Sequence, residues 1–213
     1  MNHLAHAVLA GNDEALQLGG MLGDFVRGRP DPARFSAAVI AGIRLHRAID
    51  VYTDAHPQVA AARCLLPPPY RRYAGILLDM WFDHCLARDF ARWCAQPLTP
   101  YAEALRNLLR RHHASLPPAL QHFQAYMEAN DLPRAYADPV MLDKALRGIG
   151  QRLRRDNPLD SAWPVLAAHE IALQRHFEAF FPQLQAFAWD WIAREYALDA
   201  AAPPGDECLR AAP

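Results

Sequence analysis

Histidine and aspartate side chains recur at helical spacing near the start of the chain, within segments that are otherwise apolar. His46 and Asp50 are four residues apart in GIRLHRAIDVYTDAHP, and Asp79 and Asp83 repeat that spacing in GILLDMWFDHCLAR, where His84 follows. Residues four apart project from the same face of an α-helix. A buried carboxylate without a partner costs several kcal/mol. These side chains therefore require either a metal ion or an arginine beside them.

A third acidic segment lies upstream, in GGMLGDFVRG, where Asp24 stands between Leu22 and Phe25 and precedes Arg27 by three residues. Three segments that each carry Asp or His among aliphatic neighbours could enclose one cation. Oxygen and imidazole ligands without thiolates suit manganese, magnesium or zinc, and the excess of oxygen ligands favours manganese or magnesium.

Ordinary ion pairing is the alternative interpretation of the same residues, because carboxylates and arginines at helical spacing form salt bridges without any metal. The pairs available are Asp50 with Arg47 or Arg44, Asp79 with Arg72, and Asp83 with Arg88.

Three more polar residues flank these segments. His6 could reach the site or form a hydrogen bond within the core. His56, next to Pro57, is expected to be a turn residue or to support a ligand from behind. Asp54 is expected to cap the helix that begins at Pro57, or to support the site in the same way.

The fold is predicted to be all-α, a single-domain helical bundle over residues 1–198 with a flexible tail over 199–213. Apolar residues recur at intervals of three and four, no strand-like alternation is sustained, and the eighteen prolines mark helix ends. The expected helices cover about 3–10, 14–27, 36–54, 57–65, 69–95, 100–114, 118–129, 139–154, 159–181 and 183–197.

Composition narrows the function. Of 22 basic residues only Lys144 is a lysine. Arginine binds phosphates and carboxylates in a bidentate manner, so this bias indicates an anionic partner or a GC-rich genome. The four cysteines form no CxxC pair, which favours reduced thiols.

We expect a cytoplasmic protein, because no apolar stretch approaches membrane-spanning length and no secretion signal is evident. Phosphate-loop, dinucleotide, nucleophile-elbow and DNA-reading motifs are missing, so no nucleic-acid or membrane partner is expected.

With these residues in view, the chain resembles the acyl carrier protein phosphodiesterases, from MNHLAHAVLA through the three segments above and more thinly to about FFPQL. The resemblance implies a manganese-dependent hydrolase of lipid metabolism, linked to fatty acid biosynthesis. Such an enzyme cleaves the phosphodiester between 4′-phosphopantetheine and a serine of holo acyl carrier protein. It also implies a fold that diverged from the HD phosphohydrolases.

The resemblance carries over residue by residue. Asp24 falls in G-x-x-x-x-D-F-V-R-G, His46 and Asp50 in H-R-x-I-D, Asp79, Asp83 and His84 in L-D-x-x-x-D-H, and His6 in the N-terminal motif. His3 departs from the apolar residue usual there. The adjacent pair reads Asp-His where HD enzymes have His-Asp, so we expect a related architecture with rearranged ligands.

A divalent ion would neutralise a phosphate oxygen and lower the pKa of a bound water. We predict metal ligands at Asp24, Asp50, Asp83 and His84. His46 and Asp79 are predicted as further ligands or as the base and orienting group, and Arg27 or Arg47 as the group that stabilises charge on phosphate. Manganese is the expected ion, with magnesium or another divalent ion possible.

The resemblance further implies an acidic protein substrate, so arginines are expected around the cleft. The candidates are Arg27, Arg29 and Arg34 near the first acidic motif, and Arg71 and Arg72 before the last. Two other functions stay open at this point: an HD-like phosphohydrolase of a small nucleotide, and a non-catalytic helical binding module whose polar residues form salt bridges.

Overall fold

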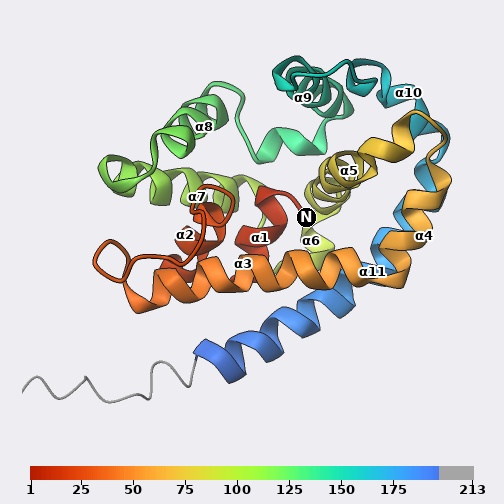
Figure 1. Cartoon of the computed structure of the whole chain (residues 1–213). Coiled ribbons are helices and arrows are strands. Elements are labelled where there is room, and N and C mark those ends of the chain that lie inside the picture. The colour runs from red at the N-terminus through yellow and green to blue at the C-terminus, as the bar shows by residue number, and fades with distance from the viewer. Residues whose placement is uncertain (197–213) are drawn as a thin grey trace, which may run out of the picture.

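The structure is a computed structural model that describes residues 1–196, and all regular elements in this range are helical (Figure 1). The all-α prediction is therefore confirmed. The α-helices are α1 (His3–Leu9), α2 (Glu14–Leu22), α3 (Ala37–Ala55), α4 (Pro57–Leu65), α5 (Ala74–Arg88), α6 (Phe90–Trp93), α7 (Leu98–His112), α8 (Pro118–Ala129), α9 (Pro139–Arg152), α10 (Trp163–Ala168) and α11 (Glu170–Trp191). Short 3₁₀ turns join them, η1 (Tyr70–Tyr73), η2 (His113–Ser115), η3 (Arg134–Ala137) and η4 (Leu159–Ser161), and a π-helical turn, η5 (Ile192–Tyr196), follows α11.

The helices surround α1, which lies near the middle of the molecule and packs against α2 and α5 (Figure 1). The long helices α3 and α11 run along one side, and α8 and α9 lie on the opposite side. A single hydrophobic core connects them, with aromatic side chains of α5 and α11, such as Trp81, Phe82 and Phe177, fully buried. The N-terminal residues are thus held within the core, where α1 can bring a side chain beside α3.

Glycines let α2 and α3 approach each other closely. A Cβ atom at Gly19 would lie 2.3 Å from the carbonyl oxygen of Val39, and one at Gly42 would lie 2.4 Å from that of Leu16. Both obstacles are backbone atoms, so neither could move aside without shifting a helix. The crossing therefore requires glycine at both positions, and it sets how closely α2 approaches α3, the helix that carries His46 and Asp50.

Several predicted helix ends were wrong. The second helix stops at Leu22, and the loop that follows carries Asp24. The expected helix 69–95 is divided into η1, α5 and α6. Pro182 does not separate two helices: it lies inside α11, since a proline removes only one backbone donor and packing can hold the helix together across it. The break falls instead at His169, between α10 and α11. The tail predicted at 199–213 lies outside the described residues.

Within residues 1–196, no helix combines the length and apolar character needed to cross a membrane.

Candidate metal centre

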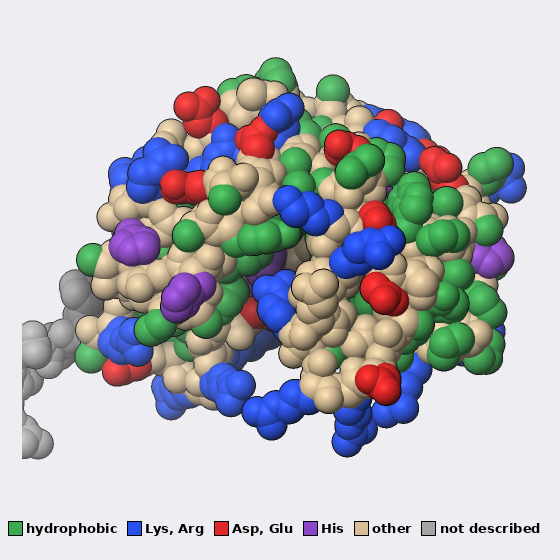
Figure 2. All heavy atoms as spheres, turned by 90° about the horizontal axis from the view of Figure 1, so that it is seen from above, with side chains coloured by type: hydrophobic (Ala, Val, Ile, Leu, Met, Phe, Trp, Pro, Cys, Tyr) green, Lys and Arg blue, Asp and Glu red, His purple; other side chains and the backbone are tan. Residues whose placement is uncertain are grey.

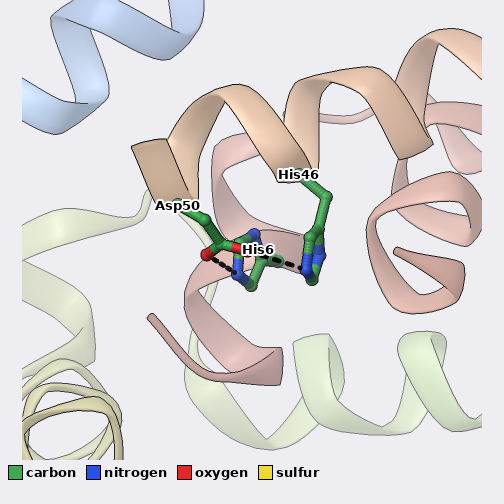
Figure 3. Close-up of side chains that lie close together, drawn as sticks. All are labelled: His6, His46 and Asp50. Carbon is green, nitrogen blue, oxygen red and sulfur yellow. Dashed lines mark ion pairs between the residues drawn. The ribbon is translucent and has the colours of Figure 1, made fainter. Parts of the chain in front are cut away.

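Two histidines and one aspartate from two helices converge in the core (Figure 3). His6 comes from α1, and His46 and Asp50 come from successive turns of α3. The Nε2 atoms of His6 and His46 each lie 3.2 Å from an oxygen of Asp50, and the two imidazole rings stack with centroids 3.6 Å apart. The three possible ligand atoms lie within 4.8 Å of one another, and no other such group of three occurs among the described residues.

The backbone of α2 orients the His46 ring. Nδ1 of His46 lies 2.8 Å from the carbonyl oxygen of Gly20, so Nδ1 carries the proton and donates it. Nε2 is thereby directed at the carboxylates, the arrangement usual for a metal-binding histidine. Gly23 makes room for the ring, because a Cβ atom there would lie 2.2 Å from Cγ of His46.

The two histidines differ in charge. Burial alone would lower the pKa of His46, but hydrogen bonds to Asp24 and Asp50 outweigh it and raise the pKa to about 9. Burial dominates at His6 and lowers its pKa to about 3, despite the hydrogen bond to Asp50. At neutral pH, His46 is therefore a cation and His6 is neutral. Asp50 stays ionised, since its hydrogen bonds with both histidines offset burial and lower its pKa.

Asp24 and Asp79 stand at the border of this group. Asp24 Oδ1 lies 3.4 Å from Nε2 of His46, on the side open to solvent. Asp79, on α5, lies 2.9 Å from the amino group of Met1, which is also 3.8 Å from Asp50. Three half-exposed or exposed carboxylates, at positions 24, 50 and 79, thus face a common region that already attracts two positive groups. The structure thus brings together the segments at 24, 46–50 and 79, whose side chains contact one another or the amino group of Met1.

Asp83 and His84 have other partners. Both oxygens of the fully buried Asp83 accept backbone N–H groups, from Leu4 at 2.8 Å and from Ala5 at 3.2 Å. Burial raises the pKa of Asp83 to about 7, although these two hydrogen bonds oppose the shift. His84 Nδ1 lies 2.7 Å from the carbonyl oxygen of Tyr136, and burial lowers the pKa of His84. The structure does not bring either residue into the metal-capable group: Asp83 ties α1 to α5, and His84 ties η3 to α5.

The other predicted residues lie around the centre rather than in it. Arg47 donates to the carbonyl oxygen of Val26 at 2.7 Å, which braces the loop after Asp24. Arg27 is exposed on that loop. The cap predicted at Asp54 was wrong: His56 accepts from the backbone N–H of Gln58 and caps α4 instead, because it directly precedes the helix. Asp54 instead pairs with Arg63 on the surface. The His56 ring also contacts the rings of Tyr52 and Phe180 in the core.

The other four arginines predicted to meet a partner fall into two groups. Arg29 and Arg34 are exposed on the loop between α2 and α3, which also carries Asp24. Arg71 and Arg72 lie in η1, at the opposite end of the molecule in Figure 1. Arg71 also donates to the carbonyl oxygens of Leu66 and Cys64, at the end of α4.

Sequence reasoning placed too little weight on His6 and did not identify Gly20 or Gly23. The signal was present in GGMLGD, where glycines at helical spacing precede the aspartate. Small residues at such spacing permit close approach of another element, here the His46 ring and α3.

A family model and individual known proteins that match this chain carry the same description. A family model described as acyl carrier protein phosphodiesterase matches residues 1–184. A protein of that name from Photorhabdus laumondii is 34% identical over 185 residues, 86% of this chain and 93% of its own. Another, from Escherichia coli O157:H7, is 35% identical over 189 residues, 88% of this chain and 97% of its own. No solved structure matches, so the expected relation to HD phosphohydrolases stays a prediction.

Proposed function

Because the chain belongs to the acyl carrier protein phosphodiesterase family, we propose that it hydrolyses the phosphodiester between 4′-phosphopantetheine and serine in holo acyl carrier protein, releasing the apo protein. The observation that carries this proposal is the convergence of His6, His46 and Asp50. An ion-binding group of this kind suits phosphodiester hydrolysis, which must overcome the negative charge of the diester. Family membership also sets aside the non-catalytic module, and no feature of the site favours a small nucleotide.

The donor set fits a divalent ion. Two imidazoles and a carboxylate, with a second carboxylate from Asp24 close by, suit ions such as manganese, zinc or iron better than magnesium, which prefers oxygen ligands. A further sign is Nδ1 of His6, which is buried without a hydrogen-bond partner among the described residues. When Nε2 binds an ion, the ring proton can reside on this free nitrogen. We propose manganese bound by His6, His46 and Asp50, with Asp24 as a further ligand.

Each residue of the chain then has a defined task. The ion would neutralise a phosphate oxygen and activate a water for attack. Without the ion, Asp50 accepts from Nε2 of both histidines and holds their rings in place; with the ion bound, the three would hold it together. Asp79, half-exposed on α5, is the proposed base, because its carboxylate faces the group without taking part in it. Arg27 is the proposed partner of a phosphate oxygen, whereas Arg47 holds the loop.

The test is direct. We expect the protein, incubated with holo acyl carrier protein and Mn²⁺, to remove the mass of phosphopantetheine from the carrier protein, as measured by mass spectrometry. Parallel reactions with Mg²⁺, Zn²⁺ and a chelator identify the ion requirement. Intact holo protein under every ion would overturn the proposal.

Metal binding should release one proton at neutral pH. The ion must displace the proton held on Nε2 of His46, whose pKa is raised to about 9, whereas His6, with a pKa lowered to about 3, has none to release. We expect apparent affinity for Mn²⁺ to rise between pH 6 and 9, by up to about tenfold per pH unit, and to level off above pH 9. Calorimetry in two buffers of different ionisation enthalpy measures the number of protons released. A value near zero at pH 7 would show that His46 is not a ligand.

The exposed arginines of the loop are proposed to attract the acidic carrier protein. Arg29 and Arg34 lie on the same loop as Asp24, and Arg29 lines a hollow together with Arg44 and Arg47. We expect the double change Arg29→Glu and Arg34→Glu to lower kcat/KM for holo acyl carrier protein at low salt by about tenfold or more, and to flatten its salt dependence. Arg72→Glu, at the other end of the molecule, provides the comparison. Equal losses from both variants would favour the sequence prediction that Arg71 and Arg72 also bind the partner.

A further inference from the structure

A cavity of about 430 Å³ adjoins the metal centre. It lies among α1, α5, α8, η3 and α9, and the face that α8 and α9 form is hollowed near its middle (Figure 2). Two residues of its wall are chain neighbours of the centre: Phe25 follows Asp24, and Met80 follows Asp79. His3, one turn before His6 on α1, forms another part of the wall. The charges of Asp24 and His46 act on the His3 ring, so this end of the cavity lies close to the centre.

The wall is largely aromatic, with a few polar groups set into it. The His3 ring lies 4.3 Å from that of Phe123, centroid to centroid, and 6.2 Å from that of Phe25. Burial lowers the pKa of His3 to about 4, so the ring is neutral and offers one donor and one acceptor. The amide of Asn2 contacts the sulfur of Met80, at 2.9 Å, and the hydroxyl of Tyr136, and sulfur is a weak acceptor that a better partner can replace.

These features match one part of the substrate. A pantetheine arm is a narrow chain that alternates apolar segments, including a dimethyl group, with two amides. Its apolar segments suit the rings of Phe25 and Phe123, and its amides suit Asn2 and His3. A cavity of this volume lies within the range of small-molecule sites, which combine apolar walls with a few polar groups. A fatty acyl chain would exclude water from Asn2 and His3 without offering either of them a new hydrogen-bond partner, at a cost in free energy.

We propose that this cavity binds the pantetheine arm while the phosphodiester lies at the metal centre. The inference rests on the proposed function and assigns a site to the half of the substrate that does not react. Binding energy from such a remote part orients the reacting group and raises the rate. His3 and Phe123 are then residues that determine specificity, since both line the cavity and their rings contact each other.

Two variants test the cavity and one serves as a control. Phe123→Ala removes an aromatic wall, and Ala119→Trp, at an exposed position on α8 that lines the cavity, obstructs it. Ala125→Trp places the same side chain at an exposed position of α8 that does not line the cavity. Melting temperature and Mn²⁺ stoichiometry verify that each variant is folded and loaded with metal.

We expect kcat/KM for holo acyl carrier protein to fall by roughly 10- to 100-fold in Phe123→Ala and Ala119→Trp. Hydrolysis of bis(4-nitrophenyl) phosphate, a diester without the arm, should change less than about twofold. Ala125→Trp should resemble the unmodified enzyme with both substrates. Free pantetheine should inhibit the unmodified enzyme, and inhibit the two cavity variants at least about tenfold more weakly.

Three outcomes would overturn the inference while leaving the proposed function intact. The first is unchanged kcat/KM for the carrier protein in both cavity variants. The second is an equal loss with the two substrates, and the third is inhibition by octanoate but not by pantetheine. If the unmodified enzyme releases no phosphopantetheine, the proposed function itself fails, and the inference fails with it.

Discussion

Replacing Asp50 by asparagine is expected to abolish stoichiometric Mn²⁺ binding and to lower turnover of holo acyl carrier protein by roughly a thousandfold or more. The substitution keeps the shape of the side chain and removes the charge that both imidazoles face. A bound ion supplies several kcal/mol of transition-state stabilisation, and each 1.36 kcal/mol corresponds to a factor of ten in rate. Metal analysis of the purified variant and single-turnover mass spectrometry measure the two effects.

Asp54→Asn is the matched control, because Asp54 is one turn further along α3 and pairs with Arg63 on the surface. It should keep its metal and its turnover.

Asp83→Asn tests whether the buried acid on α5 is a metal ligand or a structural link between α1 and α5. We expect it to lower the melting temperature, because the amide cannot accept from both Leu4 and Ala5, while the folded protein still binds Mn²⁺. Loss of metal from Asp83→Asn without loss of stability would restore Asp83 as a ligand.

Gly42→Ala is expected to lower the free energy of unfolding by about 3 kcal/mol, near the upper end of what overpacking usually costs. The added Cβ would lie 2.4 Å from the carbonyl oxygen of Leu16 and 2.8 Å from Cα of Gly19, both of them backbone atoms. Relief requires α2 and α3 to separate, which also withdraws the Gly20 carbonyl from His46. Urea unfolding of the variant measures the first effect, and its affinity for Mn²⁺ measures the second.

Gly75→Ala is the control for this substitution. Gly75 lies in the first turn of α5, and a Cβ atom there meets nothing within 4 Å. Alanine at such a position should stabilise the protein by about 0.5–1 kcal/mol, because it restricts the unfolded chain and favours helix. If both glycine variants changed stability in the same direction, the close crossing of α2 and α3 would not be the cause.

The sequence predicted well those parts of the site that depend on one helix. His46 and Asp50 share a face of α3 because they are separated by four residues in the sequence. In the structure, Nε2 of His46 lies 3.2 Å from Oδ2 of Asp50. The all-helical fold was predictable for the same reason, since helical periodicity is a local property. The helix end at Leu22 and the continuity of α11 across Pro182 were not predictable, because packing between distant segments decides where a helix stops.

The partners of the buried acids could not be predicted in this way. Asp50 and Asp83 give the same signal in the sequence, a carboxylate at helical spacing among apolar residues. In the structure, one faces two imidazoles and the other faces two backbone N–H groups. The difference arises from where α1 docks, a long-range contact that spacing along one helix does not encode. His6 was undervalued for the same reason, since only the docking of α1 brings it to Asp50.

The hydrogen bond from His46 to the Gly20 carbonyl has a consequence for how this enzyme can vary over generations. The acceptor belongs to the main chain, which every amino acid carries, so no single replacement at position 20 deletes it. Side chains around the centre can therefore be substituted while the His46 ring keeps its proton on Nδ1. The neighbouring Gly19 and Gly23 have no room for a larger side chain. We therefore expect substitutions at these two positions to be rarer than at other positions around the centre.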